Sequence, residues 1–140
     1  MNVLTSVPRT LPLASWDQYI LVLADDLGLL DSYRAALRAA GFAAVGVDDG
    51  SEALRLVETQ RPSAILLDLA QTRLDCREVQ RALKSNPDTR DIPLVVVVGI
   101  DSEDLNLNDV ACLLKKPIDV QTLVAAVRHT VSQFRTRRCS

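Results

Sequence analysis

Short apolar runs recur along this chain, and they constrain its fold more than any other feature. Each has four or five residues, and they cover residues 20–24, 64–67, 94–98 and 111–114. Runs of this length without polar alternation are typical of strands buried on both faces of a parallel sheet. The run at 94–98 is almost entirely β-branched, which favours a strand further. We also expect a short strand at residues 42–47.

Helical patterns fill the segments between these strands. One pattern of apolar residues at helical spacing closes at Gly41, as a helix with a glycine C-cap would. Asp49 begins a second helix that stops before Pro62, and a third ends at Asn86-Pro87. The last helix is expected to start near Asp119. Strands that alternate with helices in this way predict an α/β fold, with a parallel sheet covered on both faces.

The segment before the last predicted strand departs from this regularity. Residues 101–110 form a helix poorly, so we expect one or two irregular turns and a shortened fourth helix. Residues 1–18 contain two prolines and little periodicity, and we predict an N-terminal arm there. The folded domain is then expected over residues 19–134, followed by a basic C-terminal tail at residues 135–140.

Charged side chains stand at the ends of three predicted strands. They are Asp25, Asp26, Asp68 and Lys116. If these strands are neighbours, the charges meet at the carboxyl edge of the sheet, where open α/β folds bind ligands. Clustered carboxylates repel one another unless a cation offsets them, and Mg2+ fits because it takes oxygen ligands and keeps several waters. The simplest interpretation is a metal-dependent site with a carboxylate that accepts a phosphoryl group.

Structural roles compete with this interpretation. Asp residues often cap helices, so the three acids could be caps or solvated strand ends. Lys115 stands beside Lys116 and could be the inward residue, although the following Pro117 favours Lys116. His129 is interpreted as a solvated residue of the last helix rather than as a phosphorelay or metal histidine.

Composition narrows the class of protein. A length of 140 residues suits one domain with one core. The net charge of −2 argues against a strongly nucleic-acid-binding domain, and no apolar run approaches the roughly 20 residues that span a bilayer. The three cysteines show neither zinc spacing nor a disulfide framework. We therefore expect free thiols in a reducing, cytoplasmic environment.

The chain resembles the receiver domain of two-component response regulators. The resemblance rests on the five-fold β-α order and on Asp25-Asp26, Asp68 and Lys116-Pro117. It extends over about residues 19–134. The resemblance implies a flavodoxin-like, doubly wound (βα)5 sandwich whose parallel sheet has the strand order 2-1-3-4-5.

The resemblance also implies roles for individual residues. Asp68 would be the phosphoacceptor, attacking a phosphohistidine or a small phosphodonor. Asp26, Asp68 and the carbonyl of Ala70 would bind Mg2+ directly, and Asp25 would bind it through water. Lys116 would contact a phosphoryl oxygen, and the peptide bond after it would be cis. Phosphoryl transfer needs positioning and charge neutralisation, which a metal and a lysine supply.

Several positions depart from the family's pattern. Val98 stands where the family usually has a Thr or Ser, whose hydroxyl bonds the phosphoryl group. Leu113 replaces the usual aromatic switch residue of the fifth strand. Thr72 and Cys76 stand where a Pro and a Gly are usual after the phosphoacceptor. The segment from Val98 to Lys116 is shorter than usual by about one helical turn. The residues that accept the phosphoryl group are kept, whereas those that relay the signal are replaced or shortened.

Two functions from different classes follow. The first is a stand-alone receiver that takes a phosphoryl group on Asp68 from a histidine kinase or phosphotransfer protein and then binds a downstream protein target. It would not be an enzyme beyond slow self-dephosphorylation. The alternative is a phosphorylation-independent interaction module on the same scaffold. A phosphatase is disfavoured, because no second general acid or base is placed to hydrolyse an acyl phosphate. A homodimer through the fourth helix, fifth strand and last helix fits either function, and we expect no nucleic acid or membrane partner.

Overall fold

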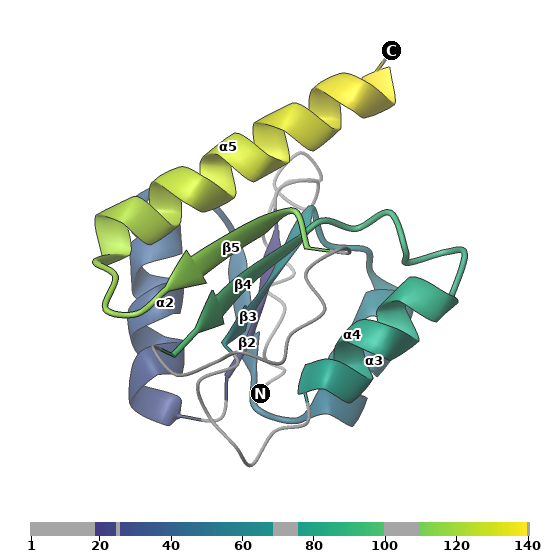
Figure 1. Ribbon diagram of the computed structural model, residues 1–140, viewed down its shortest axis with the longest axis horizontal. Helices are drawn as coiled ribbons and strands as arrows, with labels where there is room; N and C mark the ends of the chain where they lie inside the picture. Colours follow the sequence, from purple (N-terminus) through teal and green to yellow (C-terminus); the bar gives the residue numbers. More distant parts are fainter. Residues whose placement is uncertain (1–18, 25, 69–75, 100–109, 140) are drawn as a thin grey trace.

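A computed structural model describes residues 19–24, 26–68, 76–99 and 110–139. Within them, five strands form one parallel sheet in the order β2-β1-β3-β4-β5 (Figure 1). The strands are β1 (Ile20–Leu23), β2 (Ala44–Val47), β3 (Ala64–Asp68), β4 (Leu94–Val98) and β5 (Cys112–Lys115). The predicted strand order is confirmed. The carboxyl ends of β1 and β3 lie side by side, with Leu23 paired to Leu67.

Helices cover both faces of this sheet, as the alternation of strands and helices predicted. They are α2 (Leu27–Ala39), α3 (Gly50–Thr59), α4 (Cys76–Ser85) and α5 (Val120–Cys139). In Figure 1, α2 and α5 lie on one face and α3 and α4 on the other. The fold is therefore the doubly wound α/β sandwich that was expected.

Some predictions about the ends and the loops concern residues outside this description. The predicted arm at 1–18 and nearly all of the shortened fourth helix at 101–110 lie outside the described residues. The expected boundary at residue 134 falls inside α5, which continues to Cys139. The division into arm, domain and tail stays a prediction.

Two apolar clusters, one on each side of the sheet, form the core. The cluster between the sheet and the α2 and α5 layer includes Ile20, Leu66 and Val127. The opposite cluster includes Leu67 and Val57 and lies under α3 and α4. Every residue of β1, β3 and β4 is buried, because side chains on both faces of these inner strands meet a helix layer.

Glycine at position 41 determines where α2 ends. Gly41 has a φ of +99°, which side chains disfavour. Its amide donates to the carbonyl of Arg38, and the amide of Phe42 donates to the carbonyl of Leu37. These two bonds form a Schellman motif. They hold Phe42 in the helix terminus, so β2 begins at Ala44 rather than at the predicted residue 42.

Aspartates cap the first turns of α3 and α5. The Oδ1 atom of Asp49 accepts from the Ser51 amide at 2.8 Å, and that of Asp119 accepts from the Thr122 amide at 2.8 Å. The bond from the Thr122 amide holds the pKa of Asp119 below its usual value. Both helix starts therefore agree with the starts predicted from the sequence.

Two expectations from composition can be compared with the structure. Within the described residues, every helix is too short or too polar to cross a membrane. Cys112, half-buried in β5, is a free thiol, as predicted. The same prediction for Cys76 and Cys139 concerns side chains outside the description.

Candidate functional site

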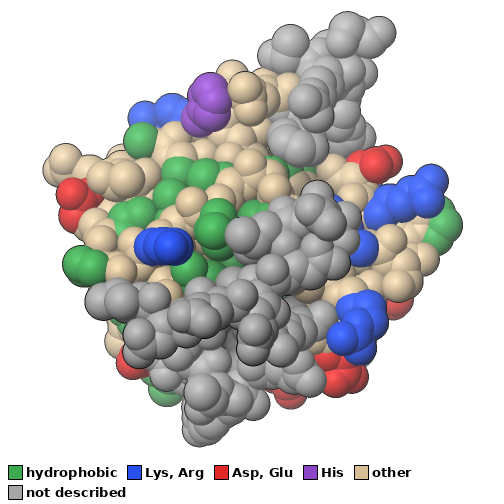
Figure 2. Space-filling view, in the orientation of Figure 1, with side chains coloured by type: hydrophobic (Ala, Val, Ile, Leu, Met, Phe, Trp, Pro, Cys, Tyr) green, Lys and Arg blue, Asp and Glu red, His purple; other side chains and the backbone are tan. Residues whose placement is uncertain are grey.

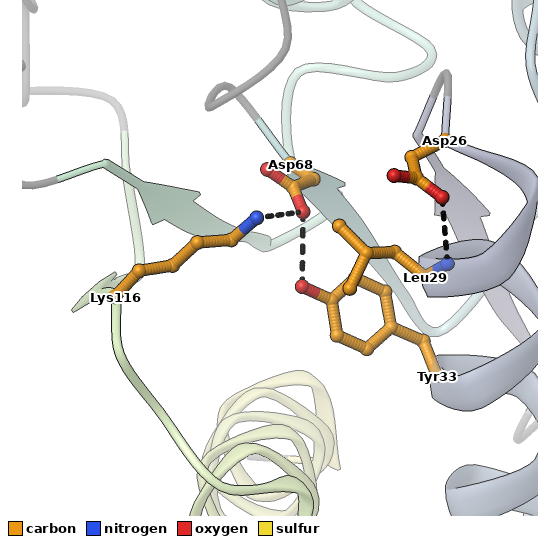
Figure 3. Close-up of polar contacts among 5 residues, drawn as sticks. All are labelled: Asp26, Leu29, Tyr33, Asp68 and Lys116. Carbon is orange, nitrogen blue, oxygen red and sulfur yellow. Dashed lines mark hydrogen bonds and ion pairs between the residues drawn. The ribbon is translucent and has the colours of Figure 1, made fainter.

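Asp68 is the centre of the candidate site. It is the last residue of β3, and its side chain is completely buried. A buried carboxylate is costly unless donors or cations compensate it. Within the described part of the chain, its Oδ2 atom accepts from the hydroxyl of Tyr33 at 2.9 Å and lies 3.0 Å from the ammonium of Lys116 (Figure 3). The protein thus supplies compensation for this charge from its own side chains.

Lys116 reaches Asp68 from the end of β5, the edge strand that is separated from β3 by β4. It follows β5, and its amide donates to the carbonyl of Val98 at 2.8 Å, which continues the pairing of β4 with β5. The bond from Lys116 to Pro117 is cis, as the resemblance implied. The neighbouring Lys115 is exposed. Lys116, which the following proline favoured over Lys115, is therefore the lysine that faces the carboxylate.

Tyr33 was not among the predicted site residues. It lies in the buried stripe of α2 with Leu30 and Leu37, within the pattern of helical spacing that closes at Gly41. Burial raises the pKa of Tyr33 far above its usual value, and the charge of Asp68, the hydrogen bond to it and the charge of Asp26 raise it further. The phenol therefore keeps its proton and acts as a donor. A tyrosine within a buried leucine stripe was the available signal, because a buried phenol usually finds a hydrogen-bond partner.

Asp26 lies at the carboxyl end of β1 and is exposed. It is the N-cap of α2, and its Oδ1 atom accepts from the amide of Leu29 at 3.1 Å. The capping alternative is thus confirmed for this residue. A cap uses one lone pair of a carboxylate, which leaves acceptor capacity for a cation. Figure 3 shows the carboxylates of Asp26 and Asp68 at the same edge of the sheet.

The donor chemistry of this edge suits a hard divalent cation. Asp26, the N-cap of α2 after β1, and Asp68, the last residue of the neighbouring strand β3, provide carboxylate oxygens. Mg2+ is commonly bound through one or two carboxylates plus waters. Asp25 and Ala70, the other predicted ligands, lie outside the described residues. Among the residues that are described, no three His, Cys, Asp or Glu side chains gather closely enough to form a complete protein cage. The two carboxylates of Asp26 and Asp68 therefore fit a cation such as Mg2+.

Two of the positions that depart from the family's pattern, Val98 and Leu113, lie together on one side of the sheet. Val98 is 1% exposed at the end of β4, within the apolar cluster under α3 and α4. Leu113 of β5 is half-buried and packs against the same cluster. The opposite cluster contains Tyr33. Apolar side chains thus pack at both positions where the family usually has a hydroxyl or an aromatic ring.

Other residues that the sequence singled out lie apart from the site or outside the description. His129 is exposed on α5, as expected for a solvated residue. Thr72 and the side chain of Cys76 lie outside the description. The structure therefore brings Asp68 and Lys116 into contact and lays Asp26 beside them, while their roles in chemistry stay predictions.

Sequence comparison identifies relatives of this chain. The sequence model described as the response regulator receiver domain matches residues 20–128. The protein named response regulator MprA of Mycolicibacterium vanbaalenii is 36% identical over 116 residues, which cover 78% of this chain and 48% of the relative. That of Mycobacterium leprae is 35% identical over 116 residues, covering 78% and 49%. The chain spans about half the length of these curated relatives.

Solved structures resemble this one over most of its length. A sensor protein from Polaromonas sp. JS666 has a TM-score of 0.74 at 27% identity, and the match covers 84% of this chain and 98% of that one. A signal receiver domain of a histidine kinase from Syntrophus aciditrophicus has a TM-score of 0.72 at 25% identity, covering 83% and 91%. The match over residues 20–128 and the shared fold lead to one assignment: this chain belongs to the response regulator receiver domain family.

Proposed function

We propose that this receiver accepts a phosphoryl group on Asp68 from the phosphohistidine of a histidine kinase or phosphotransfer protein. In that step a bond forms between a carboxylate oxygen and phosphorus while the nitrogen–phosphorus bond breaks, and its electron pair stays on the imidazole. The protein is a phosphoacceptor, with at most slow self-dephosphorylation. The phosphorylated form then acts by binding a downstream protein.

The ion pair between Asp68 and Lys116 carries this proposal. A carboxylate at the carboxyl end of β3, with an ammonium 3.0 Å away, combines a nucleophile with a cation that can neutralise a phosphoryl oxygen. Lys116 is 24% exposed, so it borders both the buried carboxylate and solvent. A simple structural pair would not need to lie at the edge where α/β folds bind ligands.

We further propose Mg2+ as the cofactor. Asp26 and Asp68 would hold it, together with the predicted carbonyl of Ala70 and a water-mediated contact to Asp25. The ion would neutralise charge on the transferring phosphoryl group. The chain's own part is to fix the two carboxylates, through the backbone pairing of β1 with β3 and the N-cap of α2.

Intact-mass spectrometry after incubation with Mg2+ and acetyl phosphate tests the proposal. The wild-type protein should gain one phosphoryl group, and Asp68→Asn should gain none. A Lys115→Met variant serves as a matched control that should be labelled like wild type, because Lys115 is exposed and the ion pair with Asp68 is made by Lys116. A wild-type protein that gains no phosphoryl group, or an Asp68→Asn variant that is labelled equally, would contradict phosphorylation at this residue.

A second candidate is an interaction module that does not depend on phosphorylation, and the packing at Val98 favours it. The family's usual hydroxyl at this position would contribute a hydrogen bond to a charged group, worth roughly 1.5–3 kcal/mol. Moving a two-state equilibrium from 1:99 to 99:1 takes about 5.5 kcal/mol. With the buried Val98 in place of a hydroxyl, a large share of the free energy that would shift this equilibrium is lost. Leu113 offers no aromatic ring to hold an active arrangement.

Amide chemical shifts on adding beryllofluoride and Mg2+ separate the two candidates. A weak response confined to the edge near Asp68, strengthened by Val98→Thr, would support a receiver with a reduced relay. Broad shifts across β4, β5 and α5 of the wild-type protein would show that the relay works without the hydroxyl. A protein that binds no beryllofluoride would favour the phosphorylation-independent module.

The partner surface that we propose comprises β5 and α5, together with the short helix predicted between β4 and β5 at residues 101–110. Figure 2 shows hydrophobic side chains gathered over β5 and α5, with basic side chains among and beside them. Residues Cys112, Leu113 and Leu114 of β5 are half-buried, and Val120 at the start of α5 is 42% exposed. Partly exposed apolar side chains on an edge strand are suited to protein contact. A downstream target, or a second copy of the chain, would bind there.

A further inference from the structure

A tyrosine of the core reaches the proposed phosphoacceptor. Tyr33 is 4% exposed in α2, among the apolar residues between the sheet and α5. Its ring packs in that layer while its hydroxyl donates to the Oδ2 atom of Asp68 at 2.9 Å (Figure 3). The two residues are 35 positions apart in the chain. The contact is therefore made by tertiary structure, because the packing of α2 on β1 and β2 brings the Tyr33 hydroxyl to the end of the neighbouring strand β3.

The hydrogen bond from Tyr33 depends on the charge state of its acceptor. A hydrogen bond to an ionised group is roughly twice as strong as one between neutral groups. In unphosphorylated Asp68 the carboxylate carries the negative charge, and Tyr33 and Lys116 both donate to the same oxygen. In a phosphoaspartate the negative charge lies on the phosphoryl oxygens, and the carboxyl group becomes a neutral acyl group. The Tyr33 hydroxyl then has the weaker acceptor.

We propose that Tyr33 is a positioning residue that favours the unphosphorylated form of Asp68 and so shortens the lifetime of the phosphoaspartate. The inference rests on the proposed function, because it concerns the acyl phosphate on Asp68. Hydrolysis forms a bond between water oxygen and phosphorus and breaks the Asp68–phosphorus bond. The electron pair returns to the carboxylate, and the proton of water leaves with the phosphate product or passes to solvent.

Charge that returns to the carboxylate in this step is shared by both of its oxygens. A donor on Oδ2 therefore stabilises the leaving carboxylate whichever oxygen carried the phosphorus. Loss of the Tyr33 hydroxyl should lengthen the half-life of the phosphoprotein about fivefold, which corresponds to about 1 kcal/mol at 1.4 kcal/mol per factor of ten. The same loss should favour phosphorylation at equilibrium.

Tyr33→Phe removes only the hydroxyl, and the chain offers a matched control in Tyr19→Phe. Tyr19 is also buried, but its hydroxyl donates to the carbonyl of Gln60 at 3.1 Å, and its ring lies in the opposite apolar cluster. Each variant is phosphorylated with acetyl phosphate and Mg2+, the donor is removed, and intact mass follows the decay. Tyr33→Phe should decay about fivefold more slowly than wild type, and Tyr19→Phe at the wild-type rate.

A second measurement tests the contact without any phosphodonor or metal. In a double-mutant cycle, Tyr33→Phe and Asp68→Asn are combined and unfolded in urea with a chelator present. The effect of Tyr33→Phe on the unfolding equilibrium constant should be several-fold smaller in the Asp68→Asn background. Equal effects in both backgrounds would overturn the inference.

The two proposals fail in different ways. If the wild-type protein takes no phosphoryl group, the proposed function fails, and this inference with it. If wild type is labelled but Tyr33→Phe decays at the same rate or faster, the inference alone is overturned. Slower decay in Tyr19→Phe as well as in Tyr33→Phe would show a general effect of lost core hydroxyls, and this too would overturn it.

Discussion

Replacement of Lys116 by methionine tests how the buried charge of Asp68 is compensated. Methionine keeps an unbranched side chain and removes the ammonium. Asp68, whose side chain is completely buried, then keeps the Tyr33 hydroxyl as a donor to Oδ2 and loses the cation 3.0 Å away. We expect the metal-free protein to be less stable.

The size of this loss follows from the exposure of the pair. Removing one partner of a buried ion pair costs about 3–5 kcal/mol when both partners are buried. Lys116 is 24% exposed, so water screens part of the interaction and can reach the site once the ammonium is gone. The cost of a buried acceptor that loses one donor, about 1–3 kcal/mol, is therefore the better expectation. Lys115→Met is the control, and as a surface change it should cost less than about 0.5 kcal/mol.

Urea unfolding followed by circular dichroism, with a chelator present, measures both variants. The cost of Lys116→Met should also shrink in the Asp68→Asn background, because the charge that the ammonium compensates is absent there. A Lys116→Met variant as stable as Lys115→Met would refute this account of the site. So would an unchanged cost in the Asp68→Asn background.

Three further outcomes are expected. Mg2+ should raise the melting temperature by mass action. Asp26→Asn should remove most of that rise while keeping the helix cap, since Asn caps as well as Asp. An unchanged rise in the variant would exclude Asp26 as a ligand. Gly41→Ala should cost about 1–2 kcal/mol in urea unfolding, because the φ of +99° is strained for any side chain; an unchanged midpoint would contradict this. The lowered pKa of Asp119 means that its charge stabilises the fold above the unfolded value of 3.8 and that this contribution is lost as pH falls through the lower folded pKa. Asp119→Asn should therefore have a lower melting temperature than wild type at neutral pH and the same melting temperature in strong acid. A difference in melting temperature that persists in acid would show that the charge is not the cause.

Local sequence patterns predicted the elements well where the deciding interactions are close in the chain. Asp49 and Asp119 cap helices through amides two and three residues away, so turn chemistry alone indicates both helix starts. Gly41 marks the end of α2 for the same reason. The start of β2 was misplaced by two residues, because the Schellman bond of Phe42 competes with strand pairing and does not appear in an apolar pattern.

The candidate site was predictable only in part. Asp68 and Asp26 follow apolar strands, and parallel pairing brings such ends together, so the acidic edge could be inferred from the sequence. The compensation of Asp68 could not be inferred. Clustered acids suggested repulsion that a metal must offset, whereas the structure shows two side-chain donors on one carboxylate oxygen.

The sequence by itself determined the alternation of strands and helices, the helix caps and the positions of charge at strand ends, because these depend on periodicity and on neighbours a few residues apart. Only the tertiary structure showed that Lys116 forms an ion pair with Asp68, and that Tyr33 donates to the same carboxylate from 35 residues away. It likewise placed the guanidinium of Arg128 against the carbonyl of Ala40, 88 residues apart. Contacts of this kind depend on strand register and helix packing, which bring distant residues within hydrogen-bond distance and leave no local pattern in the sequence.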